Sequence, residues 1–405
     1  MKKIFLLFLF LISFSFSQSQ IFLQITRNLL EKAAVYLIFN VEKSEYFESF
    51  INTLSRDLTF SGYFKVKGFK IVENIERFEK EVVSQFIITG EKEKDFLNIK
   101  VKNGITKEVI LENNFVIIKD SKKLAHIISD YIVEKLTGRP GIARSKILFT
   151  STRTGKNQIY IVDYDGDNLI QLTNVDYLVN FPRYLRKNDI LFVSYEDNWA
   201  KIAKMNIDTK KIETFIAKPG LNACVSVCQK REEIAIVLSQ SGNPEIYIAD
   251  FNGNIKKRLT DYSGIDSSPS FSPDGKYIAF VSDRNGKPQI YIMDRDGFGI
   301  RRISYISGYC TSPVFSPDGN YIAYIFSEGG KYSLAIYEME TKKTFKISNL
   351  NCEEISWAPD SRHIVYSKSE NGQELKIIDI FTKEERVLIS GNYRFSSPYW
   401  FSFVE

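Results

Sequence analysis

Histidine is scarce in this sequence, because only His126 and His363 occur among 405 residues. Two isolated histidines argue against a Ser/His/Asp triad and against a histidine-ligated metal centre. The sequence also lacks a G-x-S-x-G elbow, a Walker loop, an H-E-x-x-H motif and a Rossmann fingerprint. We therefore expect no enzymatic activity, no metal and no cofactor. His126 lies beside the apolar stripe of an expected helix, so we expect it to be structural.

Cysteine is scarce as well. Cys224 and Cys228 lie four residues apart in an expected strand, which places them too far along it to bond each other. An oxidising compartment would allow disulfides, but a metal site would need closer pairs or more histidines. We expect small core residues, or one disulfide at most, at Cys224, Cys228, Cys310 and Cys352.

Blocks of basic residues are missing. The chain has 54 Lys and Arg against 49 Asp and Glu, a formal net charge of +5, and Lys2 and Lys3 contribute part of it. A nucleic-acid footprint would need clustered basic residues, so none is indicated.

Long apolar runs are absent except at the N-terminus. Residues 1–20, MKKIFLLFLFLISFSFSQSQ, carry two lysines, an apolar run at 4–12 and then small residues. This pattern is typical of a secretory signal peptide, cleaved between positions 15 and 20. The alternative is a membrane anchor, but the run is short for a bilayer span and no lipidatable cysteine follows it. We expect a soluble, exported mature protein of residues 21–405 without a membrane span.

Residues 21–142 mix strand and helix patterns. Alternating or apolar runs predict strands at 21–26, 32–40, 85–90, 97–102 and 109–118, and a strand or loop at 64–72. Helices are expected at 46–58, at 74–83 and after Asp120 and Ser121, the last with an apolar face that ends before Gly138. These elements predict a small α/β domain with a linker at 139–144.

The rest of the chain repeats one unit, which is clearest at residues 267–304. It reads as four short strands separated by the turns SPDG, DRNG and DRDG, whose Asp, Asn, Gly and Pro suit tight hairpins. Equivalent openings at Pro182, Val225, Pro269, Pro313 and Ile355 lie about 42–44 residues apart, the spacing of β-propeller blades. The repeated Asp residues of the turns therefore indicate backbone capping rather than acid–base chemistry.

Six third strands occur, but the first blade lacks an opening strand before Lys146. The segment SPYWF at 397–401 matches an opening strand and predicts that the C-terminus completes the first blade. The expected fold is an α/β N-terminal domain (21–142) followed by an all-β six-bladed β-propeller (143–405) closed by the C-terminal strand. We therefore expect no hydrolase domain to follow the propeller.

The loops that join each outer strand to the next inner strand are rich in Tyr, Asn, Asp and Gly. This composition suits recognition of a protein partner, although loops are generally polar. The candidate partner-binding residues in these loops are Asp176, Tyr177, Asn180, Asn222, Tyr262, Asp266, Tyr305, Tyr309, Asn351, Tyr393 and Arg394.

The blade sequence SPSFSPDGKYIAFVSDRNGKPQIYIMDRDG (268–297) and the junction SDYIVEKLTGRPGIARSKILF (129–149) resemble the TolB family of the Tol-Pal system. The resemblance covers nearly the whole mature chain. It implies a monomeric, non-enzymatic periplasmic protein that supports outer-membrane integrity and constriction during cell division.

The resemblance also implies two partners. The propeller loops would bind the peptidoglycan-associated lipoprotein Pal. The segment left by signal cleavage would bind the inner-membrane protein TolA, and its alternating pattern suits strand addition to a partner sheet or docking on its own domain. This segment consists of Ile21, Phe22, Leu23, Gln24, Ile25 and Thr26.

The sequence departs from the family at several points. LRKND (185–189) and CQKRE (228–232) replace SPDG in the second and third blades, and Leu221 stands where family members can offer a histidine to Pal. Two other function classes stay open: an exported propeller enzyme, such as a peptidase-related protein or glycan lyase, and a propeller that binds a ligand or metal in its channel.

Overall fold

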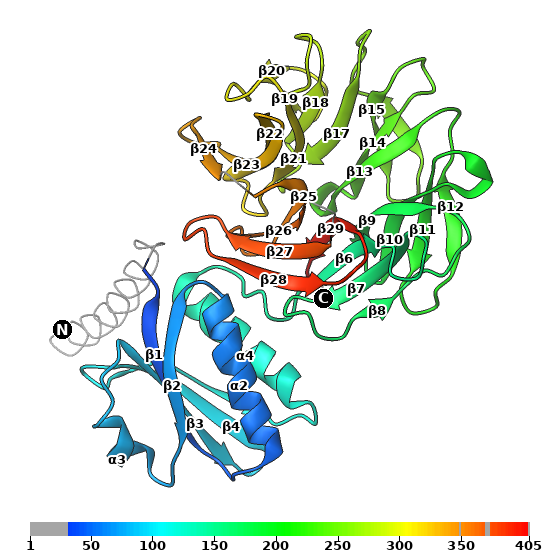
Figure 1. Cartoon of the computed structure of the whole chain (residues 1–405). Coiled ribbons are helices and arrows are strands. Elements are labelled where there is room, and N and C mark those ends of the chain that lie inside the picture. Colours follow the sequence, from blue (N-terminus) through cyan, green and yellow to red (C-terminus); the bar gives the residue numbers. More distant parts are fainter. Residues whose placement is uncertain (1–30, 348–349, 369–372, 404–405) are drawn as a thin grey trace, which may run out of the picture. The chain divides into compact units, whose positions relative to one another are not determined.

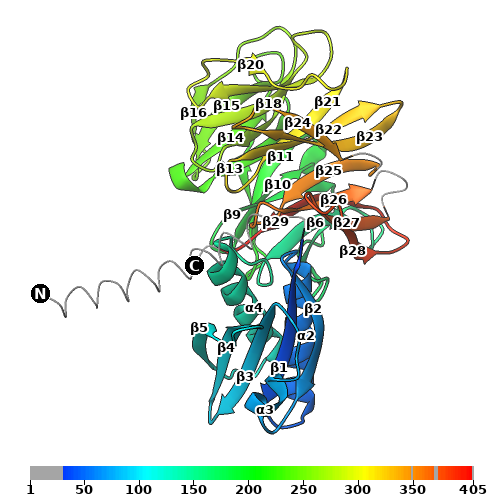
Figure 2. The same cartoon turned by 90° about the vertical axis from the view of Figure 1, so that its left-hand side faces the viewer.

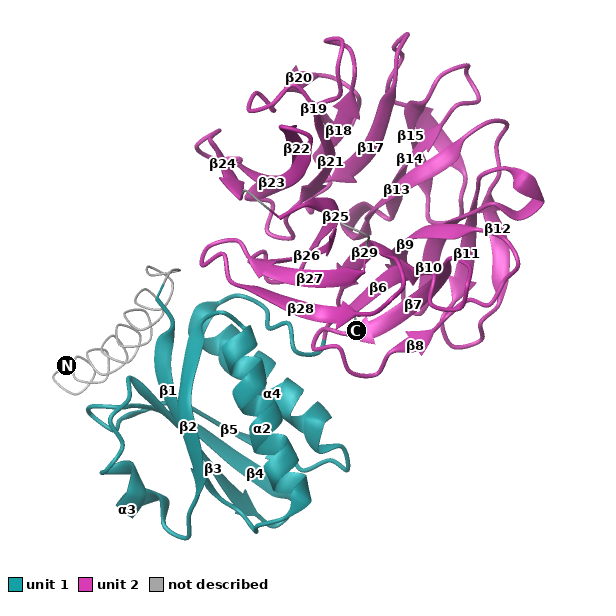
Figure 3. Ribbon diagram, in the orientation of Figure 1, with its two compact units in different colours: residues 1–144 teal, residues 145–405 magenta. Residues whose placement is uncertain are grey.

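The computed structural model describes residues 31–347, 350–368 and 373–403. The expected signal peptide and the segment 21–26 lie outside these residues. The chain divides into two compact units, Met1–Arg144 and Ser145–Glu405 (Figure 3). Within the described part of the chain, no helix is both long enough and apolar enough to cross a membrane.

Unit 1 is built on one five-stranded sheet with the order β2-β1-β3-β4-β5. Strand β1 runs parallel to both of its neighbours, β2 and β3, and β3, β4 and β5 form an antiparallel meander. The strands are β1 (Ala33–Asn40), β2 (Phe64–Ile71), β3 (Phe86–Glu93), β4 (Phe96–Asn103) and β5 (Val109–Val116).

Two helices, α2 (Glu45–Phe60) and α4 (Ser121–Thr137), lie side by side and share one apolar core with the sheet (Figures 1 and 2). Asp120 caps α4 by accepting a hydrogen bond from the Lys123 N–H at 3.0 Å, and Gly138 ends the helix with φ +68°. His126 of α4 lies 2.7 Å from the buried Asp57 carboxylate of α2. The predicted structural role of His126 is therefore confirmed.

Two expected boundaries in unit 1 differ from the structure. The second helix is a short α3 (Ile75–Glu79) instead of 74–83, because Val82 turns away from the helix to pack on Ile38 and Ile87 of the sheet. The strand expected at 85–90 is also longer in the structure, since β3 runs on to Glu93, which pairs with Phe96. A charged sequence therefore continued as strand because its backbone was paired.

Unit 2 is a six-bladed propeller in which each blade is an antiparallel sheet of four strands (Figure 1). The blades follow one another in the chain except for the first, which takes its inner strand from the C-terminus. The first blade consists of β29 (Phe395–Phe401), β6 (Lys146–Ser151), β7 (Gln158–Asp163) and β8 (Ile170–Gln171), and the second of β9 (Val179–Arg186), β10 (Asp189–Ser194), β11 (Lys201–Asn206) and β12 (Ile212–Ile216). The third consists of β13 (Asn222–Cys228), β14 (Glu233–Leu238), β15 (Glu245–Asp250) and β16 (Ile255–Arg258), and the fourth of β17 (Asp266–Phe271), β18 (Tyr277–Ser282), β19 (Gln289–Asp294) and β20 (Arg301–Arg302). The fifth consists of β21 (Cys310–Phe315), β22 (Tyr321–Glu328), β23 (Lys331–Glu338) and β24 (Thr344–Ile347), and the sixth of β25 (Cys352–Trp357), β26 (His363–Lys368), β27 (Glu374–Asp379) and β28 (Glu385–Ser390).

The middle strands of each blade are apolar at nearly every position because both of their faces are covered. In β18, Phe280 packs into the cluster shared with the third blade, whereas Val281 packs into the cluster shared with the fifth. The outer strands are shorter and more polar, as in β20, where only Arg301 and Arg302 pair. Burial between neighbouring sheets thus explains why polar and apolar residues alternate only weakly along the middle strands.

Ring closure is confirmed. The strand β29 pairs antiparallel with β6, and each inner strand contacts the next around the complete ring of β9, β13, β17, β21, β25 and β29. The Trp400 indole N–H of β29 donates to Ser145 Oγ at 2.7 Å, and Thr150 Oγ1 lies 2.8 Å from Ser396 Oγ. The two ends of the propeller chain are therefore joined by both backbone and side-chain bonds.

Serine hydroxyls link successive inner strands at equivalent positions. Ser226 Oγ accepts the Phe271 N–H at 3.0 Å, Ser270 Oγ accepts the Phe315 N–H at 3.0 Å, and Ser356 Oγ accepts the Trp400 N–H at 2.9 Å. Each link satisfies a backbone donor that points from one blade to its neighbour, where no sheet partner is available. The ring is thus held at its centre by polar bonds as well as by apolar packing.

Candidate partner-binding face of the propeller

Two sets of loops leave the propeller at the same end. In an antiparallel blade the hairpin from second to third strand and the connection from fourth strand to the next inner strand lie on one side. We call this end the loop face. It includes the candidate residues predicted from the sequence. The opposite end carries the hairpins from first to second and from third to fourth strand, and we call it the turn face.

Residues of the turn face show turn chemistry. Gly275 adopts φ +69° and donates its N–H to the Ser272 carbonyl at 2.8 Å. Asp274 accepts bonds from Ser272 Oγ at 2.7 Å and from the Lys276 N–H at 3.1 Å. Burial acts to raise the pKa of Asp274, but these bonds outweigh it and hold the pKa below its usual value. The capping role predicted for this aspartate is confirmed, and among the described residues no group of three or more His, Cys, Asp or Glu is placed to hold a metal ion.

Exposed apolar and aromatic side chains gather on the loop face. Tyr305 is 72% exposed, the largest value among them. The others come from the loops of several blades, so the apolar surface is distributed around the ring rather than confined to one blade. They are Leu178, Trp199, Leu221, Ile265, Tyr309 and Tyr393. Exposed aromatic residues are enriched at protein–protein contact surfaces.

Five of the predicted candidates are open to solvent and can touch a partner: Asp176, Tyr305, Tyr309, Tyr393 and Arg394. Four others are half-buried and present only part of their side chains: Tyr177, Asn180, Tyr262 and Asn351. Charged neighbours accompany several of them. Lys156 lies 3.2 Å from Asp176, Arg394 lies 3.4 Å from Glu353, and the Arg153 guanidinium stands 5.8 Å from the centre of the Tyr393 ring.

The prediction was wrong for Asn222 and Asp266, because both side chains are fully buried and cannot contact a partner. The Asn222 amide donates to the carbonyls of Lys218 at 2.7 Å and of Gly220 at 3.1 Å. Asp266 receives two bonds from Arg284 at 3.0 and 3.1 Å. Their polar side chains satisfy loop backbone and a buried charge, so they shape the loop face instead of forming its surface.

A recurring residue that positions the loops went unnoticed in the sequence. The first residue of the third strand, Gln158, Glu245 or Gln289, reaches the loop of its own blade. Glu245 accepts the Tyr262 N–H at 2.8 Å, and Gln289 accepts the Ser304 hydroxyl at 2.7 Å. The signal was visible in the repeated QIY and EIY sequences, but only the fold brings the two segments together.

The hairpins from second to third strand were also overlooked as part of this face. In the second blade this hairpin contains Glu196, Asp197, Asn198 and Trp199. Trp199 is exposed, whereas the chain's other tryptophans, Trp357 and Trp400, are buried. A tryptophan close to charged residues was a visible signal in the sequence. Only the strand order, however, shows that Trp199 lies on the loop face.

Comparisons with known proteins identify relatives. A family model described as the TolB beta propeller domain matches residues 133–404. Two curated proteins, each named "Protein TolB homolog", are similar to parts of the chain. The one from Chlorobium chlorochromatii is 36% identical over 156 residues, which is 38% of this chain and 35% of that protein. The one from Protochlamydia amoebophila is 26% identical over 209 residues, 46% of this chain and 45% of that protein. These alignments therefore span less than half the length of either relative.

Solved structures share the fold. The crystal structure of TolB from Acinetobacter baumannii matches with a TM-score of 0.78 and 23% identity, covering 91% of this chain and 96% of that one. A chain of a Nidogen/Laminin complex matches with a TM-score of 0.55 and 11% identity over 64% of this chain and all of that one. At these identities the likeness concerns the fold alone.

Proposed function

The chain belongs to the TolB beta propeller family, and on this premise we propose that it is a non-enzymatic periplasmic protein that binds protein partners. Its loop face would bind a Pal-like lipoprotein, and its N-terminal segment would bind a TolA-like inner-membrane protein. Through these partners it would support outer-membrane integrity and constriction during cell division.

The observation that carries the proposal is the gathering of exposed tyrosine, tryptophan and aliphatic side chains on the loop face. Aromatic anchors dominate the energetics of many protein interfaces because they bury large areas at little entropic cost. Hydrogen bonds to the buried side chains of Glu245 and Asp266 hold loops of this face in place. A surface whose loops are already ordered can bind without a large ordering cost.

The loop face is tested by replacing, one at a time, two aromatic residues that are about equally exposed. One lies on the loop face and the other on the turn face. Tyr305 on the loop face is 72% exposed, and Phe298 on the turn face is 70% exposed. We expect Tyr305→Ala to weaken binding of the soluble domain of the organism's own Pal-like lipoprotein by about tenfold or more. Phe298→Ala should leave the affinity unchanged. The measurement is surface plasmon resonance on the mature protein, and equal effects of both substitutions would refute the assignment of the face.

The N-terminal segment is tested separately. Removing residues 21–26 from the mature protein should abolish capture of the periplasmic domain of a TolA-like protein. The same variant should still bind the Pal-like lipoprotein, because the propeller loops are unaltered. Retained TolA capture would show that another surface carries this contact.

A further inference from the structure

A pocket of about 170 Å³ lies in the second blade of the propeller, beside the connection from the first blade. Tyr177 enters it from the connection between the first and second blades. Glu196 comes from the exposed hairpin between β10 and β11, and strands β10, β11 and β12 supply the remaining walls. Pockets for drug-sized ligands run from about 300 Å³ upward, so this one is of a size for a single side chain. We call it the Glu196 pocket; its lining consists of Tyr177, Ser194, Glu196, Lys201, Ala203, Ile212, Glu213 and Thr214.

The charged groups of this pocket are unevenly paired. The Lys201 ammonium lies 2.6 Å from Asp197 and 5.2 Å from the centre of the Trp199 ring, so its charge is already compensated. The Glu213 carboxylate lies 2.7 Å from Lys204. Among the described residues, no hydrogen bond or ion pair engages the Glu196 carboxylate. One uncompensated negative charge therefore remains.

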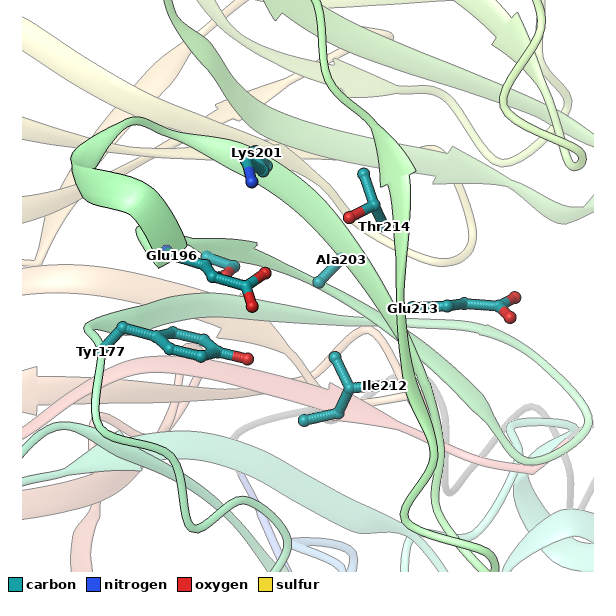
Figure 4. Close-up of a pocket in the computed structure, with 8 residues that line it drawn as sticks. Tyr177, Glu196, Lys201, Ala203, Ile212, Glu213 and Thr214 are labelled. Atoms are coloured by element: carbon teal, nitrogen blue, oxygen red, sulfur yellow. The ribbon is translucent and has the colours of Figure 1, made fainter.

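The orientation of the side chains places that charge inside the pocket. Figure 4 shows the Glu196 carboxylate and the Tyr177 hydroxyl reaching into the same space, with Ile212 and Ala203 along its walls, whereas the Glu213 carboxylate is turned away. Burial raises the pKa of Tyr177, and the negative charge of Glu196 raises it further. The tyrosine hydroxyl thus stays neutral and able to accept a hydrogen bond from a cation.

We propose that the Glu196 pocket binds a lysine or arginine side chain of the protein that docks on the loop face. The aliphatic stem would lie along Ile212 and Ala203, while the cationic end would bond to Glu196 and Tyr177. An anion is disfavoured because Lys201 is already paired with Asp197. The proposal rests on the loop face as the partner-binding surface, and it adds that one contact of the partner is made by a cationic side chain.

Small probes test the pocket without any partner. We expect Nα-acetyl-lysine methylamide and Nα-acetyl-arginine methylamide at millimolar concentration to give saturation-transfer NMR signals with the mature protein. Nα-acetyl-norleucine methylamide, which keeps the stem but lacks the charge, should give none. Glu196→Gln should lower the affinity for the cationic probes by about tenfold. Glu213→Gln removes a nearby charge that points elsewhere and should keep the affinity within about twofold.

Three outcomes would overturn the inference: no signal from either cationic probe, an equal signal from the norleucine probe, or unchanged binding after Glu196→Gln. Thermal melting of both variants checks that each remains folded. Because these experiments use no partner protein, their failure would leave the loop-face proposal standing. Conversely, an intact probe signal together with unchanged partner binding by the Tyr305 variant would refute the loop face and the docked protein as the source of the cation, while the affinity of the pocket for cationic side chains would stand.

Discussion

At the residue scale, the cysteines show how burial decides chemistry. All four are free thiols, and Cys228, Cys310 and Cys352 are buried. Burial raises the pKa of Cys352 to about 12 and moves the pKa of each of the other three thiols upward as well. The expectation of small core residues is confirmed for the three buried thiols. A raised pKa leaves little of the reactive thiolate at neutral pH.

We predict that iodoacetamide at about pH 8 will leave Cys228, Cys310 and Cys352 unmodified in the folded protein. With a pKa of about 12, only about one Cys352 thiol in ten thousand is ionised at that pH. All four cysteines should react in guanidinium chloride, which serves as the control. Peptide mass spectrometry measures the modification, and rapid labelling of Cys352 in the native state would contradict the assignment.

Glu354 on the inner strand β25 is a second residue whose environment matters. Its carboxylate is bonded by the backbone N–H and hydroxyl of Ser397 on β29. Burial is the largest influence and raises the pKa of Glu354 above 4.5, although Ser397 and the charge of Arg183 act in the opposite direction. The folded state therefore favours the protonated form, so the fold loses stability as pH rises through the interval between the unfolded and folded pKa values.

We predict that Glu354→Gln will stabilise the protein at neutral pH, because the glutamine oxygen can still accept the Ser397 N–H, its amide can donate to the Ser397 hydroxyl, and it carries no charge. Its advantage over the wild type should be smallest below pH 4.5, grow as pH rises above that value and then level off. Glu328→Gln is the control, since the Glu328 side chain is 65% exposed and does not act on the pKa of Glu354. Urea unfolding across this pH range measures the effect, and a pH-independent difference would contradict it.

At the element scale, tight turns set where each strand ends. Gly275 closes the hairpin between β17 and β18 with φ +69°, and a Cβ there would come within 2.7 Å of Arg231 and 2.8 Å of the Cys228 sulfur. Gly286 closes the next hairpin with φ +88°, but a Cβ there would meet nothing within 4 Å. The Gly275 turn is thus in contact with the third blade, whereas the Gly286 turn, at the other end of the same blade, has open space around it.

This difference predicts unequal costs for the same substitution. Gly286→Ala should lower the free energy of unfolding by about 1 kcal/mol, the cost of a left-handed backbone for an L-residue. Gly275→Ala carries that cost plus the displacement of Arg231 and Cys228, and should lower it by about 2–4 kcal/mol. Chemical denaturation of both variants provides the test. Equal losses would mean that the third blade does not confine the Gly275 turn.

At the scale of the whole molecule, the propeller is a ring whose first blade is built from both ends of its chain. Trp400 and Phe401 of β29 are buried, and Phe401 stacks on Tyr184 of the second blade with ring centres 4.7 Å apart. The closing strand therefore contributes to the first blade and to its contact with the second. The closure also gives the first blade the same four paired strands as the other five.

We predict that deleting residues 397–405 will lower the free energy of unfolding by about 5 kcal/mol or more, because it removes large buried side chains and most of the backbone pairing on one edge of β6, which then pairs fully only with β7. A chain ending at Phe403 keeps all of β29 and should melt close to the intact protein. Differential scanning calorimetry compares the two. An unchanged melting temperature for the longer deletion would contradict the role of closure.

Much of the fold could be read from the sequence because the repeat is local and regular. The turn residues, the blade spacing and the match of SPYWF to other opening strands predicted six closed blades, and the structure confirms them. The TolB resemblance is confirmed as family membership. The candidate site was less predictable, because Asp176 and Asp266 both stand in polar stretches of the sequence, yet the first is open to solvent and the second is buried against Arg284.

The sequence alone determined the architecture of this protein, since hairpin turns and apolar strands act over a few residues and recur with a fixed period. Only the tertiary structure decided which loop residues form a surface, because burial depends on segments that lie far apart in the chain. Glu245 lies at the start of a strand but holds Tyr262, and Tyr177 meets Glu196 and Ile212 only after the connection from the first blade packs on the second. A turn forms between residues that are neighbours in the sequence, whereas a binding surface combines residues from distant parts of the chain.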